Sequence, residues 1–323
     1  MLVVILLVLL LLCQSYSITS STLPYLNVDG FSWAENLCFD GNGNLFVSDW
    51  RRGEFWRIFL NDDGNGYEKE VVMTGDFKHT GGMQVNKDGT IIYAGVTYNN
   101  DTKAIIYWST NTTSTTTYYT LTETNHQPNG LAYDYNRNIF YYTDEGMSKK
   151  DAPTGGSLTA YDVESKTFTM IKDDIDGADG LWLDIDNNKL YVGLLMKKNI
   201  LVFDTTDNSL INIFEGLSSL SILNQIDDLT LYTTTDTTNL TNTRIVAADW
   251  LHKDIKVFDL AGTNIETVNV DKSTGAHELH QPTSVRWGKG RGFDENSIYV
   301  TEGGGVENDG TSRRVIQIVM TKK

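Results

Sequence analysis

The stretch Asp179-Gly180-Leu181-Trp182-Leu183-Asp184-Ile185-Asp186-Asn187-Asn188-Lys189-Leu190-Tyr191-Val192 contains the pattern that decides the fold of this chain. A head residue is followed by a mainly apolar run, a polar turn and a second run rich in β-branched and aromatic residues. This order predicts two antiparallel strands joined by a tight turn. The pattern occurs six times, and its heads are Glu35, Gly81, Asn129, Asp179, Asp227 and Thr283. The heads lie 46, 48, 50, 48 and 56 residues apart, which is the period of a four-stranded propeller blade.

Further strand signals follow each head in the same order, with a third strand in every period and a fourth strand in five of them. The sixth period ends too close to Lys323 to hold a fourth strand. The segment from Leu23 to Val28 precedes the first head and has no period of its own. Because an unpaired outer edge invites aggregation, we expect this segment to complete the sixth blade. The sequence therefore predicts an all-β fold, a six-bladed β-propeller whose ring is closed by an N-terminal strand.

Two other all-β architectures, a β-sandwich and a β-helix, would also give short strands and polar turns. Neither predicts six periods near 50 residues with a common head. The longest spacing contains the Thr-rich stretch 233–243, which we expect to be a surface hairpin. No helix is expected outside the N-terminal leader.

The N-terminus begins with an unbroken apolar run from Leu2 to Leu12, followed by the small residues Ser15 and Ser17. This pattern predicts a secretory signal peptide over residues 1–17 and a single propeller domain over residues 18–323. An uncleaved membrane anchor is the alternative. Three glycosylation acceptors support a secreted, extracellular protein that has no membrane attachment after cleavage: Asn100, Asn111 and Asn239.

Charge and cysteine content restrict the partners further. A net charge of -16 argues against nucleic acid or an anionic membrane surface as partner and suits cation binding, although acidity also serves solubility. Cys13 lies in the leader, so Cys38 is left without an internal disulfide partner. We expect Cys38 to be a small buried apolar residue rather than a nucleophile, because no His or Lys adjoins it in the sequence. We expect a monomer held together by core packing.

The heads indicate a metal site, because the innermost strands of a propeller run beside its axis and corresponding residues form a ring there. The candidate ligands are Glu35, Asn129, Asp179 and Asp227, all of which offer oxygen. Three crowded carboxylates would repel one another, and a divalent cation removes that cost. Ca²⁺ suits an all-oxygen set best, whereas Zn²⁺ prefers Cys and His and Mg²⁺ accepts fewer protein ligands. Gly81 and Thr283 are expected to leave part of the ring open to water and substrate, and a purely structural cation is the alternative.

The sequence resembles the family of senescence marker protein, gluconolactonase and luciferin-regenerating enzyme, with diisopropyl fluorophosphatase as a structural cousin. The resemblance covers roughly residues 31–318 and rests on four short motifs in the same order and spacing: Trp33-Ala34-Glu35-Asn36-Leu37, Gln127-Pro128-Asn129-Gly130-Leu131-Ala132, Gly177-Ala178-Asp179-Gly180-Leu181 and Pro282-Thr283-Ser284-Val285. In that family a Glu from the first blade and Asn or Asp residues from the third, fourth and fifth blades hold one catalytic metal, usually Ca²⁺ or Zn²⁺. By position these residues correspond to Glu35, Asn129, Asp179 and Asp227.

Two departures from the family pattern concern the substrate. Sugar-lactone hydrolases usually place an Arg before the third motif, whereas this chain has Gln127 there. They usually carry Asn at the fourth head, whereas this chain has Asp179. The additional carboxylate favours Ca²⁺, and the missing Arg weakens the case for an acidic sugar lactone.

Three histidines stand shortly before a head: His79, His126 and His280. We expect all three, together with Gln127, near the same mouth of the channel, where a His would act as a general base or orient a substrate. The alternative is that the repeated His-Gln-Pro sequence is a turn inherited by the repeats and has no chemical role.

These features lead to the hypothesis of a secreted, Ca²⁺-dependent ester hydrolase, most simply a gluconolactonase-like lactonase acting on a small-molecule ester or lactone through activated water. Asp227 and Glu35 are the candidate catalytic carboxylates, with a rim histidine as the alternative base. Two other functions stay open: a non-catalytic propeller that binds a protein or glycan, and a phosphotriesterase-like hydrolase.

Overall fold

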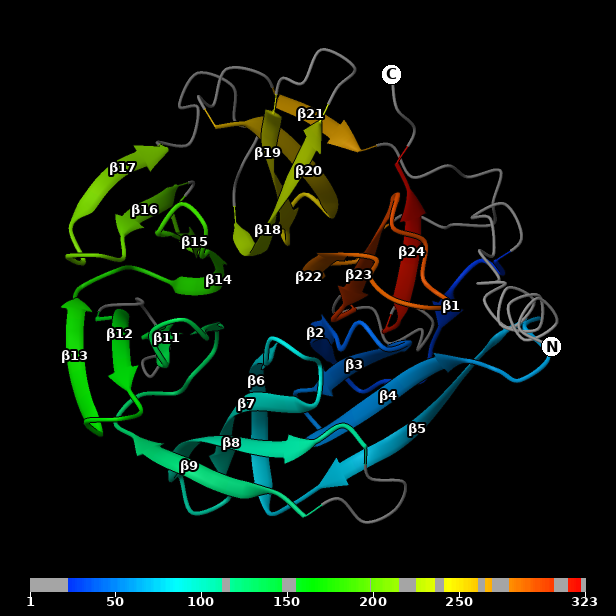
Figure 1. The fold of residues 1–323 in the computed structure, drawn as a ribbon, viewed down its shortest axis with the longest axis horizontal. Helices are drawn as coiled ribbons and strands as arrows, with labels where there is room; N and C mark the ends of the chain where they lie inside the picture. The colour runs from blue at the N-terminus through cyan, green and yellow to red at the C-terminus, as the bar shows by residue number, and fades with distance from the viewer. Residues whose placement is uncertain are drawn as a thin grey trace, which may run out of the picture.

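The computed structural model describes residues 23–111, 117–146, 155–197, 199–214, 225–235, 241–260, 265–268, 279–304 and 313–320. Within these residues the chain forms six four-stranded antiparallel sheets arranged around one axis, and it contains no helix (Figure 1). The prediction of a six-bladed β-propeller is confirmed. The expected signal peptide at 1–17 lies outside the described residues.

The strands follow the predicted order from the axis outwards in each blade. The first three blades consist of β2 (Ala34–Phe39), β3 (Asn44–Asp49), β4 (Glu54–Leu60) and β5 (Tyr67–Thr74); β6 (Phe77–Val85), β7 (Ile91–Tyr98), β8 (Lys103–Ser109) and β9 (Tyr119–Thr124); and β10 (Leu131–Asp134), β11 (Ile139–Asp144), β12 (Ser157–Asp162) and β13 (Thr167–Lys172). The fourth and fifth blades consist of β14 (Ala178–Asp184), β15 (Lys189–Leu194), β16 (Ile200–Asp204) and β17 (Leu210–Phe214); and β18 (Ile226–Thr235), β19 (Thr241–Asp249), β20 (Asp254–Asp259) and β21 (Ile265–Val268).

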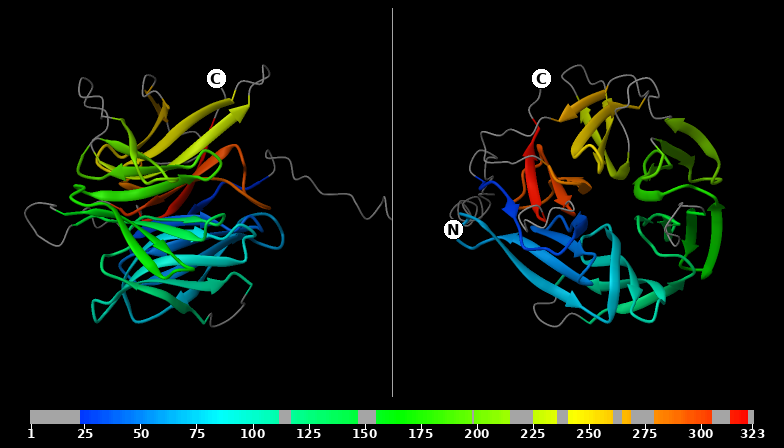
Figure 2. Two further views of the ribbon diagram at one scale, coloured as in Figure 1. Left: turned by 60° about the vertical axis from the view of Figure 1, so that its left-hand side comes forward. Right: turned by 180° about the vertical axis from the view of Figure 1, so that it is seen from behind.

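The sixth blade closes the ring with a strand from each end of the chain. It consists of β22 (Pro282–Trp287), β23 (Ser297–Glu302), β24 (Val315–Val319) and the N-terminal β1 (Asn27–Val28), which pairs antiparallel with β24. The backbone N–H of Gln317 donates to the carbonyl of Leu26 at 2.9 Å, and β1 and β24 lie side by side from both directions of view (Figure 2). The predicted closure by the segment before the first head is therefore confirmed.

The hydrophobic core lies between neighbouring blades rather than in one central mass. Strand β2 is buried along its whole length because both of its faces are covered. The ring of Phe55 in the first blade packs against Trp108 of the second with 4.9 Å between ring centroids. Each such large side chain contributes about 1.5–3 kcal/mol when fully buried, so the blades are held together by packing. Cys38 belongs to this core, and burial raises its thiol pKa to about 12, as expected of a buried apolar residue.

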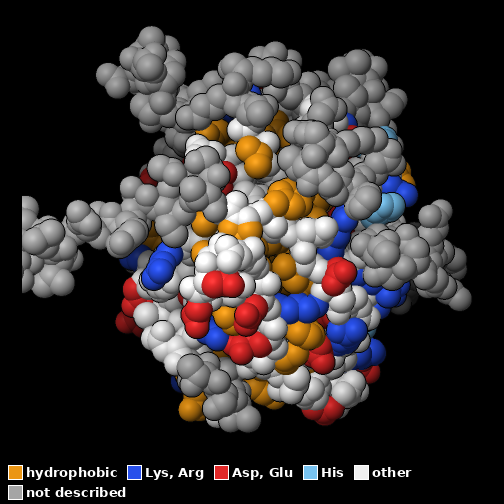
Figure 3. Space-filling model, turned by 90° about the vertical axis from the view of Figure 1, so that its right-hand side faces the viewer, with side chains coloured by type: hydrophobic (Ala, Val, Ile, Leu, Met, Phe, Trp, Pro, Cys, Tyr) orange, Lys and Arg blue, Asp and Glu red, His pale blue; other side chains and the backbone are white. Residues whose placement is uncertain are grey.

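Two further observations concern the surface. No helix long and apolar enough to cross a membrane is found in the part of the chain that the structure describes. On the side of the molecule shown in Figure 3, acidic and basic side chains of the described residues lie next to one another.

Candidate functional site

The six heads lie at one end of the ring axis, which we call the head face. Strands within each blade are antiparallel, so each second strand ends beside the beginning of the first. In five blades the pairing of these two strands shifts register at the head, for example between Ala34 and Leu37 and between Ile226 and Leu229. Such β-bulges redirect side chains, which accounts for the inward direction of the heads.

Four heads and one neighbouring carboxylate meet at the axis and form what we call the head cluster: Glu35, Asn129, Glu145, Asp179 and Asp227. The Asn129 side-chain amide donates hydrogen bonds to Asp179 and to Glu145. Glu35 and Asp227 interact electrostatically with Asp179. The four heads are between 3% and 7% exposed, so the structure brings the four predicted ligands together in a buried place.

The carboxyl groups of the head cluster hold protons unusually strongly. Burial, with repulsion by Glu145, raises the pKa of Glu35 to about 8, although a hydrogen bond from Trp33 opposes this shift. Burial first, and then mutual repulsion among the neighbouring acids, raises the pKa of Asp179 and of Asp227 well above the usual range. Burial and the neighbouring Asp144 raise the pKa of Glu145 to about 7. Apart from Trp33, all the side chains that set these pKa values are acidic, so the negative charge has no compensation from within this group.

The donor atoms of the head cluster are of the kind that binds a cation, but their present positions do not form a coordination site. Among the described residues, no three His, Cys, Asp or Glu side chains lie closely enough around one point to hold a metal ion. The Asn129 amide nitrogen instead occupies the place between two carboxylates and neutralises part of their repulsion. A half-turn of that amide would exchange its nitrogen for an oxygen of nearly the same size, and the cluster would then offer only oxygen atoms. Hard oxygen donors with excess negative charge suit Ca²⁺.

Glu145 is a member of this cluster that the sequence analysis missed. It directly follows β11, and its position follows from the antiparallel hairpin, which returns the end of a second strand to the head face. Three other second strands also end in an acidic residue at the head face: Asp49, Asp249 and Glu302. Carboxylates at the ends of second strands therefore also lie at the head face, and the repeated head pattern does not include them.

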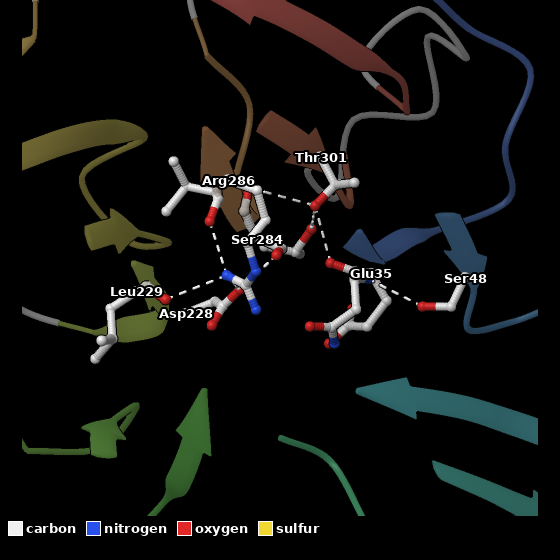
Figure 4. Close-up of polar contacts among 10 residues, drawn as sticks. Glu35, Ser48, Asp228, Leu229, Ser284, Arg286 and Thr301 are labelled. Atoms are coloured by element: carbon white, nitrogen blue, oxygen red, sulfur yellow. Dashed lines mark hydrogen bonds and ion pairs between the residues drawn. The ribbon is translucent and has the colours of Figure 1, made fainter. Parts of the chain in front are cut away.

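A second feature that the sequence did not predict involves residues directly after the heads, such as Asp228 and Ser284. It joins the fifth, sixth and first blades (Figure 4). Asp228 accepts hydrogen bonds from Arg286, at 2.5 Å, and from Ser284. The Arg286 guanidinium also donates to the carbonyls of Leu229, at 3.1 Å, and Val285. Asp228 and Arg286 are 1% and 7% exposed, so this is a buried ion pair, in which Oδ2 of Asp228 accepts both hydrogen bonds and Oδ1 has no partner. Arg286 directly follows the motif that contains Thr283. Its pairing with Asp228 is a contact between two blades, and sequence spacing does not predict such a contact.

The first blade adds an aromatic group beside Glu35. The Trp33 indole N–H donates to Glu35 Oε2 at 2.5 Å. Its ring lies 6.3 Å from that of Trp50, and Trp50 in turn stacks on His79 at 4.0 Å between centroids. The Arg51 guanidinium lies 4.5 Å above the Trp33 ring. Trp33 therefore holds one oxygen of Glu35, and His79 is packed against an aromatic ring.

The other rim residues have different surroundings. His126 Nδ1 lies 2.8 Å from Asp144 Oδ2 at the end of β11. The backbone N–H of His280 donates to Glu302, which also pairs with Arg314 at 2.5 Å. Gln127 lies partly buried in the connection before β10. The structure thus distributes the three predicted histidines over the second, third and sixth blades.

The expected openings at Gly81 and Thr283 are not present in the expected form. A Cβ atom at Gly81 would lie 2.3 Å from the carbonyl oxygen of Pro128, so this glycine permits the second and third blades to approach closely. Thr283 is fully buried and its hydroxyl donates to the carbonyl of Ala34 at 2.6 Å. Both residues serve the closure of the ring because the neighbouring backbone fills the space beside them.

Two of the three predicted glycosylation acceptors lie on the described surface. Asn100 is exposed in the turn between β7 and β8, and Asn111 is exposed just after β8. Asn239 lies outside the described residues.

Comparisons with known proteins identify the fold but not the family. No protein-family model matches the sequence, and no curated protein matches it either. Solved structures do match. A luciferin-regenerating enzyme superposes with a TM-score of 0.63 at 15% identity, over 91% of this chain and 95% of that one. The calcium-binding protein regucalcin of Agrobacterium tumefaciens superposes with a TM-score of 0.62 at 13% identity, over 93% and 97%. A structure of a nidogen/laminin complex matches with a TM-score of 0.57 at 16% identity, over 76% and 82%.

These identities are low enough that the likeness establishes the propeller fold alone. The matched proteins include an enzyme and a calcium-binding protein, and also a complex between proteins. A shared propeller therefore does not decide between catalysis and binding.

Proposed function

We propose that this protein is a secreted, Ca²⁺-dependent hydrolase of small-molecule esters, with lactones as its first candidate substrates. The observation that carries the proposal is the head cluster itself. Three buried carboxyl groups and the partly buried one of Glu145 converge on the axis with raised pKa values, and no basic side chain of the described chain is among the groups that set them. Burying several like charges is costly, so such a cluster is expected where a cation is bound.

The ligand set follows from which carboxylates are already paired with a basic side chain. Glu35, Asp179 and Asp227 would hold the ion together with the side-chain oxygen of Asn129, and Glu145 is within reach through its contact with Asn129. Asp228 is excluded from this set because Arg286 already neutralises it. Regucalcin, a structural neighbour, is described as calcium-binding, which agrees with the choice of ion.

When bound, Ca²⁺ would supply a Lewis acid that polarises an ester carbonyl and stabilises the negative charge developing on its oxygen. The chain itself supplies the groups that orient water and move its proton. Asp227 and Glu35 would orient the attacking water, because both lie in the head cluster beside the other carboxylates. The partly exposed ring of Trp33 borders Glu35 and would limit water on that side of the substrate.

The decisive experiment measures bound metal and hydrolysis on the same preparation. Purified protein should contain Ca²⁺ by elemental analysis and should hydrolyse at least one member of a panel of lactones, thiolactones and aryl esters. Exhaustive chelation should abolish this activity, and added Ca²⁺ should restore it. Full activity after chelation would overturn the proposal, and tight partner binding without any turnover would favour the binding function instead.

A further inference from the structure

A His–Asp pair lies at the head face of the third blade, where Asp144 ends β11. His126 Nδ1 and Asp144 Oδ2 are 2.8 Å apart, and their side chains are 36% and 18% exposed. The pair is held from both sides. The Thr124 hydroxyl donates to the carbonyl of His126 at 2.6 Å, and the backbone N–H of Gly146 donates to the other oxygen of Asp144 at 3.1 Å. The imidazole is therefore oriented by a fixed carboxylate while it stays open to solvent.

The pair is also joined to the predicted ligands by short connections. Asp144 directly precedes Glu145, which accepts a hydrogen bond from the side chain of Asn129. His126 lies three residues before Asn129 on the segment that leads into β10. Asp144 thus lies at the end of β11, and His126 lies in the connection that leads into the neighbouring β10.

The other histidines of the head face lack this arrangement. His79 stacks on Trp50, and its Nδ1 is buried without a hydrogen-bond partner. His280 is held through its backbone N–H. His252 does contact a carboxylate, Asp249, at 2.7 Å, but the two residues belong to one tight turn.

The turn that contains His252 has a counterpart in the first blade. There Arg52 contacts Asp49 at the same spacing of three residues. In both turns the backbone N–H three residues after the aspartate donates to its side chain, from Arg52 at 3.4 Å and from His252 at 3.1 Å. An arginine thus occupies the place of His252 in the matching turn and contacts its aspartate at a longer distance, 3.8 Å. This makes His252 a matched control for His126.

We propose that His126 is the general base of the reaction and that Asp144 positions it, an inference that rests on the proposed ester hydrolysis. With Nδ1–H donated to Asp144, Nε2 presents a lone pair to the attacking water. Nε2 takes one proton from the water as its oxygen bonds to the carbonyl carbon. The same proton passes to the leaving alkoxide oxygen when the carbon–oxygen bond of the ester breaks. The products are a carboxylic acid and an alcohol, or one hydroxy acid from a lactone, and no further reactant is needed.

Kinetics of three variants test the proposal. His126→Gln should lower kcat by about 100-fold or more, the usual contribution of a general base, with KM and Ca²⁺ affinity changed less than about twofold. Asp144→Asn should lower kcat by at least about tenfold, because an amide donates to Nδ1 and selects the wrong tautomer. His252→Gln should leave kcat within about twofold of the wild-type value. Added imidazole should restore part of the activity of a His126→Gly variant.

A measurement without substrate tests the geometry independently. Protein labelled with ¹⁵N in its histidines should show His126 protonated at Nδ1 with an unprotonated Nε2, and Asp144→Asn should remove that preference. A His126 protonated at Nε2 would overturn the assignment. Wild-type kcat in His126→Gln would overturn the base role alone, whereas a wild-type protein that hydrolyses no member of the ester panel would overturn the proposed function and the base role together.

Discussion

The heads of the ring and the residues directly after them are equally buried but have different kinds of partner. Asp227 is surrounded by other acids, which raise its pKa well above the usual range. Asp228, its neighbour in the chain, is paired with Arg286 and accepts a further hydrogen bond from Ser284. In the first blade, the backbone N–H of Asn36, which directly follows the head, donates to the Ser48 hydroxyl at 3.0 Å. Gly130 N–H donates to the Thr143 hydroxyl at 2.9 Å.

This difference separates the residues that join neighbouring blades from the carboxylates that we propose bind Ca²⁺. Thr301 donates to the carbonyl of Glu35 at 2.9 Å, and Thr143 donates to that of Asp179, so hydroxyls below the heads link adjacent blades. Buried polar groups in folded proteins nearly always have partners, which makes an unpaired group an indication of function. Asp179 and Asp227 interact with acidic neighbours and with no basic side chain of the described residues, whereas Asp228 is paired with Arg286. Replacing a member of the Asp228–Arg286 pair and replacing an acidic head should therefore have opposite effects on the stability of the metal-free protein.

The largest effect is expected from Arg286→Met. This change leaves Asp228 as an unpaired buried charge and should lower the free energy of unfolding by about 3–5 kcal/mol. Chemical denaturation with added Ca²⁺ and with chelator measures it. The double variant Arg286→Met/Asp228→Leu removes both charges and should recover most of the loss. A single variant as stable as the wild type would show that the pair does not support the ring.

Replacing a head should instead impair catalysis while sparing the metal-free fold. Asp227→Asn should lower kcat/KM for the best substrate by about 100-fold, equivalent to about 2.7 kcal/mol, while Ca²⁺ still binds through the other heads. In chelator the same variant should be at least as stable as the wild type, because it removes one of the repelling acids. Asp228→Asn is the matched control, since its side chain has the same size and lies one residue away. A clear loss of metal-free stability in Asp227→Asn would contradict the distinction between the heads and the residues directly after them.

The sequence was sufficient for the architecture and for the members of the head cluster that start a strand. Periodic heads and the missing sixth outer strand led to the ring and to its closure by β1, because both depend on local pattern and on simple strand pairing. Glu145 and Arg286 were not found because their roles depend on which strand ends meet at the head face and on contacts across blades. Gly81 was misread as an opening, because sequence does not show that Pro128 of the next blade fills the adjoining space.

The pH dependence of stability should be reversed from that of a surface carboxylate. The pKa of Glu35 is raised from 4.5 to about 8, so the folded state retains a proton between these pH values that the unfolded state has lost. Stability of the chelated protein should therefore be highest below about pH 4.5 and fall as pH rises to about 8, by about 1.4 kcal/mol per pH unit for each retained proton. Thermal unfolding at several pH values measures this slope.

Ca²⁺ should remove most of that slope because it replaces the protons of the head cluster. It should therefore raise Tm more at pH 8 than at pH 5. Glu302, whose pKa burial also raises to about 7, lies beside Arg314 and serves as an internal reference, because Glu302→Gln should lower the slope equally with and without Ca²⁺. Equal slopes for the wild type in both conditions would place the proton uptake outside the head cluster.

The smallest effect is expected from Trp33→Phe, which tests how firmly one head must be held. Phenylalanine keeps an aromatic ring against Trp50 but removes the N–H that donates to Glu35. One such hydrogen bond contributes about 0.5–1.5 kcal/mol, so Ca²⁺ affinity should fall by roughly two- to tenfold with little change in Tm in chelator. Titration calorimetry measures the affinity. Trp50→Phe disturbs the stacking with His79 but leaves the contact between Trp33 and Glu35, and it should change Ca²⁺ affinity less than Trp33→Phe does. The reverse order would mean that packing of the rings, rather than the hydrogen bond, positions Glu35.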